Sequence, residues 1–295
     1  MSDYVLSCCS TVDLTPDLLA SRNVPCVFFN YELDGEQCRD DFGKTNSPAE
    51  LYAKMLAGAP ARTSQVSVGE YEEHFKPILD EGHDILHVTL SSGISGSYQS
   101  ALNAAADLKD QYPDRRIVVV DSLCASAGYG LFVDRLADKR DEGMGLDELA
   151  AWAEANRLRL QHWFFSTDLT FFVRGGRVSK AAGAVGGLLN ICPLLTVTRE
   201  GKLDTFEKIR TKKKAIRAAL AKMHEYARDR EGYDGKVFIS NSECMDDARA
   251  LADLIEADFA KVDGGVQIFD IGATIGCHTG PGTVALFFWG DERPM

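Results

Sequence analysis

The sequence predicts an α/β protein with two domains. Through the first half, apolar stretches rich in β-branched residues alternate with segments whose apolar side chains recur at helical spacing, and this order is typical of a largely parallel sheet covered by helices. The chain has 295 residues, whereas one domain usually has about 100–200. We therefore expect an N-terminal α/β domain over residues 1–160 with a largely parallel sheet, and a C-terminal α/β domain over residues 161–295 with a mixed sheet.

Two helices in the N-terminal half have clear start signals. Ser47 precedes Pro48, and Ser67 is followed by Glu70 at the spacing of a capping box. Further helices are expected near residue 13, after residue 97, up to about residue 140 and, as a long amphipathic helix, over 146–160. Strands are expected over residues 4–7, 24–31, 85–90 and 116–120.

The C-terminal half contains five further apolar stretches that predict strands. They cover residues 162–166, 191–198, 236–240, 267–271 and 284–289, and a helix is expected over 246–259. The segment 181–189 is rich in Gly and Ala, which suits close packing or the wall of a ligand site. The segment 272–283 has four glycines, more than a connector needs, and is expected to be a loop.

Charge and cysteine content exclude several classes of function. Asp and Glu number 44 and Lys and Arg 32, which gives a net charge of −12 and disfavours nucleic-acid binding. None of the eight cysteines has zinc spacing and several lie in apolar runs, so we expect a reducing, cytoplasmic location and no metal. The N-terminus lacks the pattern of a signal peptide, and no apolar run reaches the about 18 residues of a membrane helix, so no stable membrane insertion is expected.

The stretch Leu90–Ala101, LSSGISGSYQSA, lies where a predicted buried strand ends and a helix begins. A helix start offers unpaired backbone N–H groups and the positive end of the helix dipole. Gly93 and Gly96 let the backbone approach a bound group closely, and the serine hydroxyls can donate to it. The stretch favours a site for a carboxylate or phosphate, although a helix cap with a glycine turn explains the same residues.

Ser95 and His278 are the candidates for catalysis. Ser95 lies in GISGS, a near match to the GxSxG nucleophile elbow in which Ser97 takes the last position. His278 lies among the glycines of segment 272–283, where it could donate to an anion or be satisfied by backbone groups. The chain lacks the phosphate loop GxxxxGKS/T and a GxGxxG after a strand, and no cofactor is expected.

Residues 208–217, the basic run, form a local cationic segment on an acidic chain. A solvated helix face explains such a run, but so does a negatively charged partner. Its cations are Lys208, Arg210, Lys212, Lys213, Lys214 and Arg217.

Seven stretches, in order along nearly the whole chain, resemble motifs of the DegV family, which includes the fatty-acid-binding subunits of bacterial fatty acid kinases. Cys9 stands where Asp is usual, which we expect to alter a polar edge of the site, and Val66 stands where Pro is common, which we expect to change only the stiffness of the loop. The stretches are CSTVDL (Cys9–Leu14), TSQVS (Thr63–Ser67), SSGISGSYQSA (Ser91–Ala101), VVDSLCASAGYG (Val119–Gly130), RGGRVS (Arg174–Ser179), KIRTKKKA (Lys208–Ala215) and IGATIGCHTGPGT (Ile271–Thr283).

The resemblance implies a long-chain fatty acid held between the two domains, with its carboxylate at Thr63, Ser95 and His278. It implies a non-catalytic carrier that presents this carboxylate to the catalytic subunit of a separate, ATP-dependent fatty acid kinase, which forms an acyl phosphate for phospholipid synthesis. The resemblance adds the neighbouring ligand-binding candidates Ser64, Ser92, Gly96 and Thr279, and the partner-binding candidates Arg177 and Arg210.

Two other functions stay open at this point. One is a serine hydrolase that acts on a lipid ester through Ser95 and His278. The other is a binding protein for another lipid or apolar anion, without a kinase partner. Turnover of a generic ester would indicate the hydrolase, and the lack of a kinase in the same cell would favour the second.

Overall fold

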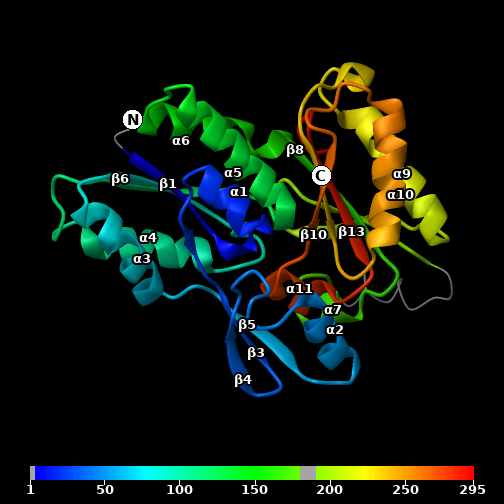
Figure 1. Ribbon diagram of the computed structural model, residues 1–295, viewed down its shortest axis with the longest axis horizontal. Helices are drawn as coiled ribbons and strands as arrows, with labels where there is room; N and C mark the ends of the chain where they lie inside the picture. Colours follow the sequence, from blue (N-terminus) through cyan, green and yellow to red (C-terminus); the bar gives the residue numbers. More distant parts are fainter. Residues whose placement is uncertain (1–3, 180–190) are drawn as a thin grey trace.

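The computed structural model describes residues 4–179 and 191–295 (Figure 1). The described strands form sheets of four, six and three strands. The two larger sheets lie beside each other in Figure 1, and the three-stranded sheet lies below them. The segment 181–189, expected to pack closely or to line a ligand, lies outside the described residues.

The four-stranded sheet is parallel throughout, which confirms the parallel sheet expected in the N-terminal half. Its strand order is β2 (Cys26–Val27), β1 (Tyr4–Cys9), β6 (Asp84–Thr89) and β7 (Ile117–Asp121). In Figure 1, one face carries α3 (Val68–Asp80) and α4 (Ser97–Leu108), and the other carries α1 (Pro16–Ser21), α5 (Ser126–Asp141) and α6 (Leu146–Asn156). A short 3-10 turn, Ser10–Val12, follows β1.

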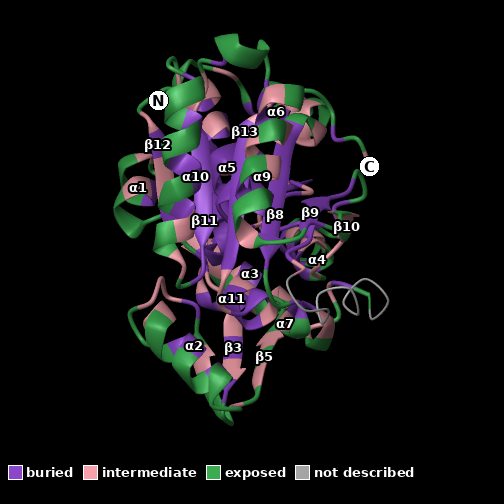
Figure 2. Ribbon diagram, turned by 90° about the vertical axis from the view of Figure 1, so that its right-hand side faces the viewer, coloured by how far each residue is buried: buried purple, intermediate pink, exposed green. Residues whose placement is uncertain are grey.

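The six-stranded sheet is mixed, as expected for the C-terminal half, because β11 and β12 pair in parallel and the other neighbours are antiparallel. Helices α9 (Lys212–Tyr226) and α10 (Met245–Asp258) lie in front of its buried strands in Figure 2, and a 3-10 turn, Arg230–Gly232, precedes β11. The strand order is β10 (Leu203–Glu207), β9 (Leu194–Val197), β8 (Leu160–Ser166), β13 (Thr283–Trp289), β11 (Val237–Asn241) and β12 (Val266–Asp270).

Helix α5 packs between the two larger sheets. It contacts β1 on one side and β8, β11 and β13 on the other, and twelve of its 16 residues are buried. Gly128 and Gly130 permit this double contact, since a Cβ on Gly128 would lie 2.5 Å from His162 Nε2 and one on Gly130 would lie 2.5 Å from the carbonyl oxygen of Val12. Both sheets therefore share one hydrophobic core, which includes Leu6 and Phe287.

The three-stranded antiparallel sheet was not predicted. It consists of β4 (Glu36–Arg39), β3 (Asn30–Leu33) and β5 (Ala61–Ser64), and the strand expected over 24–31 is divided between β2 and β3. The division occurs because the backbone of Phe29 donates to Ser10 Oγ and accepts from Asp40 N–H, and these bonds take its pairing groups away from the sheets.

The small sheet and α2 (Pro48–Leu56) pack against α11 (Ala273–Thr279), near α7 (Thr170–Arg174), and these two helices come from the C-terminal half. An N-terminal segment thus shares a hydrophobic cluster with a C-terminal helix. Strand β8 begins at Leu160, next to the expected boundary, and the domain limits 1–160 and 161–295 stay a prediction.

Two further element predictions were wrong. The helix expected over 146–160 ends at Asn156, because the carbonyls of Leu158 and Arg159 accept N–H groups from the C-terminal segment and a 3-10 turn, Arg157–Arg159, leads directly into β8. The loop expected over 272–283 contains α11. The first N–H groups of α11 pair with carboxylates from the start of the chain, a contact that no local pattern contains.

Candidate ligand-binding site

A pocket of about 220 Å³ lies beyond the carboxyl end of β6, where segments from both halves of the chain meet. In open α/β sheets, ligands usually bind at the carboxyl ends of the strands. Its polar lining residues are Thr63, Ser64, Gln65, Ser95, Arg177, Thr274, His278 and Thr279, and its larger apolar ones are Phe29, Leu90, Ile94, Phe172, Leu203 and Ile275. This combination suits a ligand with an apolar body and one polar group.

A hydrogen bond joins the two halves of the chain inside this pocket. Thr63 Oγ1, at the end of β5, lies 2.7 Å from His278 Nε2 on α11. The other ring nitrogen, Nδ1, faces Gly175, where a Cβ would lie only 2.1 Å away. Gly175 therefore leaves room for the imidazole, and the Thr63 bond sets its orientation.

The imidazole of His278 is neutral at pH 7. Burial, followed by the charge of Arg177, lowers its pKa to about 4. A neutral imidazole presents one N–H donor and one acceptor. An anion that takes the place of the contact between Thr63 and His278 can accept hydrogen bonds from both groups, and the ring then binds it without a positive charge of its own.

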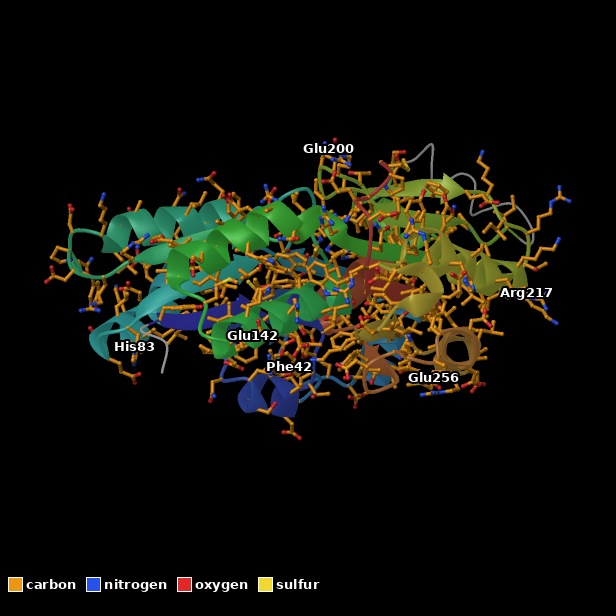
Figure 3. All side chains as sticks on the ribbon, turned by 90° about the horizontal axis from the view of Figure 1, so that it is seen from above. Phe42, His83, Glu142, Glu200, Arg217 and Glu256 are labelled. Carbon is orange, nitrogen blue, oxygen red and sulfur yellow. The ribbon has the colours of Figure 1, made fainter. Side chains whose placement is uncertain are left out.

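Ser95 lies in the turn that leads into α4. Its hydroxyl is 3.0 Å from Ser97 Oγ, and it accepts a weak hydrogen bond from the Ser97 N–H. The preceding Ser91 donates to the carbonyl of Gly201, in the turn between β9 and β10, and a Cβ on Gly93 would lie 2.6 Å from the Glu200 carbonyl oxygen. Figure 3 shows Glu200 on this turn at the upper edge of the molecule. The SSG loop, Ser91–Gly96, is thus held by both halves of the chain.

Gln65 was missed as a site residue, although it lies inside the TSQ motif. It lines the pocket, and its side-chain amide donates to Ser100 Oγ at 2.9 Å. A Cβ on Gly96 would lie 2.0 Å from Gln65 Oε1, so glycine at this position lets the SSG loop touch the TSQ loop, Thr63–Ser67. The motif itself was the available signal, since it placed Gln65 beside Thr63 and Ser64.

The structure brings six of the seven candidate ligand-binding residues together and separates the seventh. Thr63, Ser64, Ser95, Gly96, His278 and Thr279 line the pocket. Ser92 does not line the pocket. It is exposed to solvent, and its backbone N–H donates to Asp121 Oδ1 at 3.0 Å. Thr279 Oγ1 is buried and has no hydrogen-bond partner among the described residues.

The two candidate partner-binding residues lie in different surroundings. Arg177 lines the pocket and donates to the carbonyls of Ile94 and Gly175, and no described carboxylate lies within ion-pair distance of it. Burial lowers its pKa, yet an arginine stays charged at neutral pH. Arg210 is exposed, immediately before α9, and lies outside the pocket lining. Arg217, at the other end of the basic run, lies at the outer edge of the molecule in Figure 3.

The geometry does not favour the hydrolase alternative. A serine nucleophile needs a histidine within hydrogen-bond reach, but His278 Nε2 is bonded to Thr63 and Ser95 to Ser97. Gly175 takes the space in front of Nδ1, where a third catalytic group would have to orient the ring. Within residues 4–179 and 191–295, no cluster of His, Cys, Asp and Glu could hold a metal ion.

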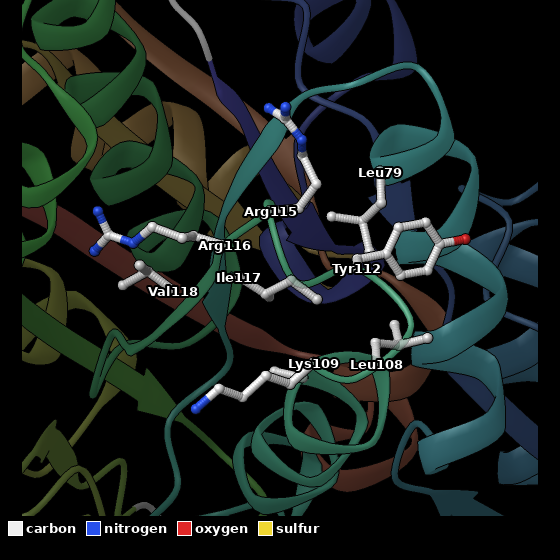
Figure 4. Close-up of a pocket in the computed structure, with 9 residues that line it drawn as sticks. Leu79, Leu108, Lys109, Tyr112, Arg115, Arg116, Ile117 and Val118 are labelled. Atoms are coloured by element: carbon white, nitrogen blue, oxygen red, sulfur yellow. The ribbon is translucent and has the colours of Figure 1, made fainter.

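A second hollow, of about 290 Å³, lies at the opposite end of the parallel sheet. Figure 4 shows it between the C-terminal ends of α3 and α4 and the start of β7, with Lys109, Arg115 and Arg116 around it. It contains none of the motif residues, and it lies at the amino ends of the strands. We therefore place the candidate site in the first pocket.

The family model that matches this chain covers residues 9–291 and is described as uncharacterised protein, DegV family. The chain belongs to the DegV family. DegV domain-containing proteins of Clostridium perfringens and of Streptococcus pyogenes are 33% and 34% identical to it, over 99% and 96% of both chains. The DegV resemblance seen in the seven motifs is confirmed.

Solved structures of DegV proteins share the fold over nearly the full length. A protein of Thermus thermophilus, described under fatty acid binding of a DegV family protein, is 30% identical, with a TM-score of 0.86 over 98% of this chain and 99% of that one. The fatty acid kinase B3 protein of Streptococcus pneumoniae, loaded with linoleic acid, is 23% identical, with a TM-score of 0.84 over 99% and 100%. The second likeness shows the fold alone.

The two departures from the family pattern lie outside or beside the site. Cys9 is fully buried away from the pocket lining, with its Sγ 3.4 Å from Tyr71 Oη and 3.6 Å from His87 Nε2. Burial raises the pKa of its thiol to about 12. Val66 does more than change the stiffness of the loop, since its N–H donates to Ser97 Oγ at 3.2 Å, a bond that proline could not make.

No helix in the described part of the chain is both long enough and apolar enough to cross a membrane.

Proposed function

We propose that this protein is a fatty-acid carrier, which binds a long-chain fatty acid in the pocket with its carboxylate at Thr63, Ser95 and His278. The observation that carries the proposal is the 2.7 Å contact between Thr63 Oγ1 and His278 Nε2 inside a pocket whose lining combines polar groups with the apolar side chains of several buried residues. The fatty-acid binding described for the Thermus thermophilus relative supports it.

The energetics agree with this role. Burying about 14 methylene groups at about 0.8 kcal/mol each yields roughly 11 kcal/mol. Association costs of about 4–15 kcal/mol offset much of this gain. The carboxylate must therefore find partners, since an unpaired buried charge would cancel the rest. Two hydroxyls and a neutral imidazole can supply them, and the Arg177 guanidinium adds a favourable charge nearby.

We further propose that the protein is not itself an enzyme but presents the bound carboxylate to a separate, ATP-dependent fatty acid kinase. Hydrogen bonds from hydroxyls leave one carboxylate oxygen available for phosphoryl transfer, which a bidentate arginine would hinder. The exposed Arg210 and the basic run offer a docking surface for an acidic or phosphate-bearing partner. A cytoplasmic location belongs to this proposal.

Lipid analysis of the purified protein tests the binding function. We expect a stoichiometric amount of long-chain fatty acid by mass spectrometry of a denatured extract, or saturable binding of added stearic acid, and no turnover of a generic lipid ester. The absence of both endogenous and added fatty acid would refute the carrier function. Ester turnover that is lost in Ser95→Ala would favour the hydrolase instead.

Arginine variants test the kinase role. Arg210→Ala is expected to keep bound fatty acid and a nearly unchanged melting temperature, whereas acyl phosphate formation with the kinase is strongly reduced. Arg177→Ala removes the charge beside the carboxylate, so it is expected to retain fatty acid at somewhat lower affinity, and the loaded protein should likewise form much less acyl phosphate. Arg174→Ala, an exposed arginine of the same turn, serves as the control and should behave like the parent. If Arg177→Ala instead loses lipid binding and thermal stability together, with a normal kinase step on the remaining loaded protein, Arg177 has a structural role.

A further inference from the structure

Two buried carboxylates bind the first turn of α11, the helix that carries His278. Asp40 Oδ1 accepts the N–H of Ala273 at 3.2 Å, and Asp40 Oδ2 accepts the N–H of Thr274 at 3.1 Å. Asp13 Oδ1 accepts the N–H of Gly272 at 3.1 Å. The N-cap residue of α11, Gly272, has no side chain that could cap the helix, so these distant carboxylates satisfy its first N–H groups.

Asp13 occupies this position under backbone strain. Its φ of 49° lies in the left-handed region, as does the φ of 54° at Ser126, the residue that donates to Asp13 Oδ2 at 2.5 Å. Ser126 also contacts Ser240 Oγ at 3.0 Å, on β11. Left-handed conformations are costly for residues other than glycine and persist where surrounding contacts hold them. Gly272 and Ser126 thus bond to the Asp13 carboxylate directly, and Ser240 holds Ser126 in place.

The two carboxylates have no cation to balance them. Among the described residues, no Lys, Arg or His forms an ion pair with either one. The titratable groups that face them carry no positive charge, and they are Asp270, Asp41, Tyr52, Tyr31, Cys277 and Cys26. Burial raises the pKa of both carboxyl groups, and their hydrogen bonds oppose this shift. The N–H groups at the start of α11 therefore compensate for this buried acid pair, together with the hydroxyls of Ser126 at Asp13 and of Ser10 at Asp40.

The helix they hold is short and closely packed. A Cβ on Gly272 would lie 2.6 Å from Asp13 Oδ1, and one on Gly276 would lie 2.6 Å from Tyr52 Oη. His278 lies only six residues after Gly272, so a shift of the first turn moves the imidazole relative to Thr63.

We propose that Asp13 and Asp40 are positioning residues, which place His278 against Thr63 by holding the first turn of α11. The role in ligand binding rests on the proposed function, whereas the position of His278 can be measured without any ligand.

Asp40→Asn is the direct test, and Asp41→Asn is its matched control, because the Asp41 carboxylate bonds only within its own turn, to Lys44 and Thr45. An asparagine at position 40 can accept only one of the two N–H groups. We expect NMR titration of the ligand-free protein to show the pKa of His278 moving from about 4 toward its ordinary value in Asp40→Asn. The affinity for stearic acid should fall about tenfold or more. Asp41→Asn should change neither.

Compared with Asp40→Asn, Asp13→Asn is expected to change the pKa of His278 and the affinity for stearic acid less. Its oxygen can still accept from Gly272, and its amide can donate to Ser126, whose hydroxyl is free to donate to Ser240. A folded Asp40→Asn protein with the parent's His278 titration and stearic acid affinity would overturn the proposal.

If Asp40→Asn does not fold, Gly272→Ala replaces it, since the added methyl group displaces Asp13 while both acids remain. The same shift of the His278 pKa is then expected, and an unchanged titration overturns the proposal. A parent protein that fails to bind stearic acid refutes the carrier function, but it leaves the titration of His278 as an independent result.

Discussion

At the scale of single residues, the pocket combines charge-free donors with one guanidinium. The neutral His278 imidazole and the Thr63 hydroxyl face each other. The Arg177 guanidinium donates to two backbone carbonyls and to no described carboxylate. An anion that enters the pocket therefore meets hydroxyl and imidazole groups that can donate to it, next to a positive charge that no described side chain neutralises.

Thr63→Ala and Ser95→Ala are expected to weaken stearic acid binding while the protein stays folded. Each removes one hydrogen bond to a charged oxygen, worth about 1.5–3 kcal/mol, or roughly ten- to a hundredfold in affinity. Ser92→Ala, from the same loop but outside the pocket lining, should bind like the parent. Isothermal titration with stearic acid and thermal melts measure both effects, and parent-like affinity in both site variants would place the carboxylate elsewhere.

Acid stability offers a second test at this scale. His74 Nε2 has no hydrogen-bond partner among the described residues, and burial lowers the pKa of its ring to about 4. Between its ordinary pKa of 6.5 and about 4, the unfolded chain binds a proton at His74 and the folded chain does not, so stability falls as the pH falls. The buried His87 and His162 act in the same direction, while Asp13 and Asp40, with raised pKa values, act in the opposite one.

His74→Phe removes this protonation and retains a ring beside Phe75, which lies 5.7 Å away between ring centroids. We expect the midpoint of acid unfolding, followed by circular dichroism, to move to lower pH. His83→Phe, at a half-buried position after α3, is the control for the exchange of histidine by phenylalanine, and we expect the larger shift of the midpoint in His74→Phe. An unchanged midpoint in His74→Phe would mean that this ring is already hydrated in the folded protein.

At the scale of elements, local signals predicted what local contacts stabilise. Ser47 with Glu50 and Ser67 with Glu70 form the capping boxes that the sequence indicated, because all the partners lie within four residues. Helix α11 was missed because its first N–H groups bond to Asp13 and Asp40, more than 230 residues away. The candidate site was likewise only partly predictable from local sequence. The motifs identified the residues that line the pocket, but the contact between Thr63 and His278 spans 215 positions and has no periodic signature.

The TSQ loop and α4 are joined by the bond from the Val66 N–H to Ser97 Oγ, which a double-mutant cycle can isolate. Ser97→Ala in the parent leaves a buried N–H without a partner and should cost about 1–3 kcal/mol in the free energy of unfolding. In a Val66→Pro background, which has no N–H at this position, the same substitution should cost clearly less. Urea unfolding of the four proteins gives the difference, and equal costs in both backgrounds would mean that this bond contributes nothing.

At the scale of the whole molecule, a single arginine near the C-terminus joins segments from both sheets. Arg293 is 1% exposed, and its guanidinium donates to the carbonyls of Leu123, Arg157, Leu160 and Thr198 and to Cys124 Sγ. Leu123 and Cys124 follow β7 of the four-stranded sheet. The other acceptors lie just before β8, at its first residue, and just after β9, in the six-stranded sheet. The C-terminal segment therefore closes the contact between the two sheets.

Arg293→Ala should lower the free energy of unfolding by more than about 3 kcal/mol, because several buried carbonyls lose their donor at about 1–3 kcal/mol each. Arg228→Ala is the control, since Arg228 is exposed and its side chain pairs with Asp229 and Asp234 at the surface, and it should cost less than about 1 kcal/mol. Chemical unfolding measures both variants. A similar small loss in the two proteins would mean that water replaces the Arg293 bonds without cost.

The position of α5 between the sheets has a consequence for biosynthesis. The helix is complete once residue 141 has been made, but the strands that cover its second side, β8, β11 and β13, end with residue 289. While the ribosome adds those residues, the apolar side of α5 has no covering surface. The nascent N-terminal half is thus an expected client of chaperones that shield apolar helices, and its release from them should coincide with the emergence of the last strand.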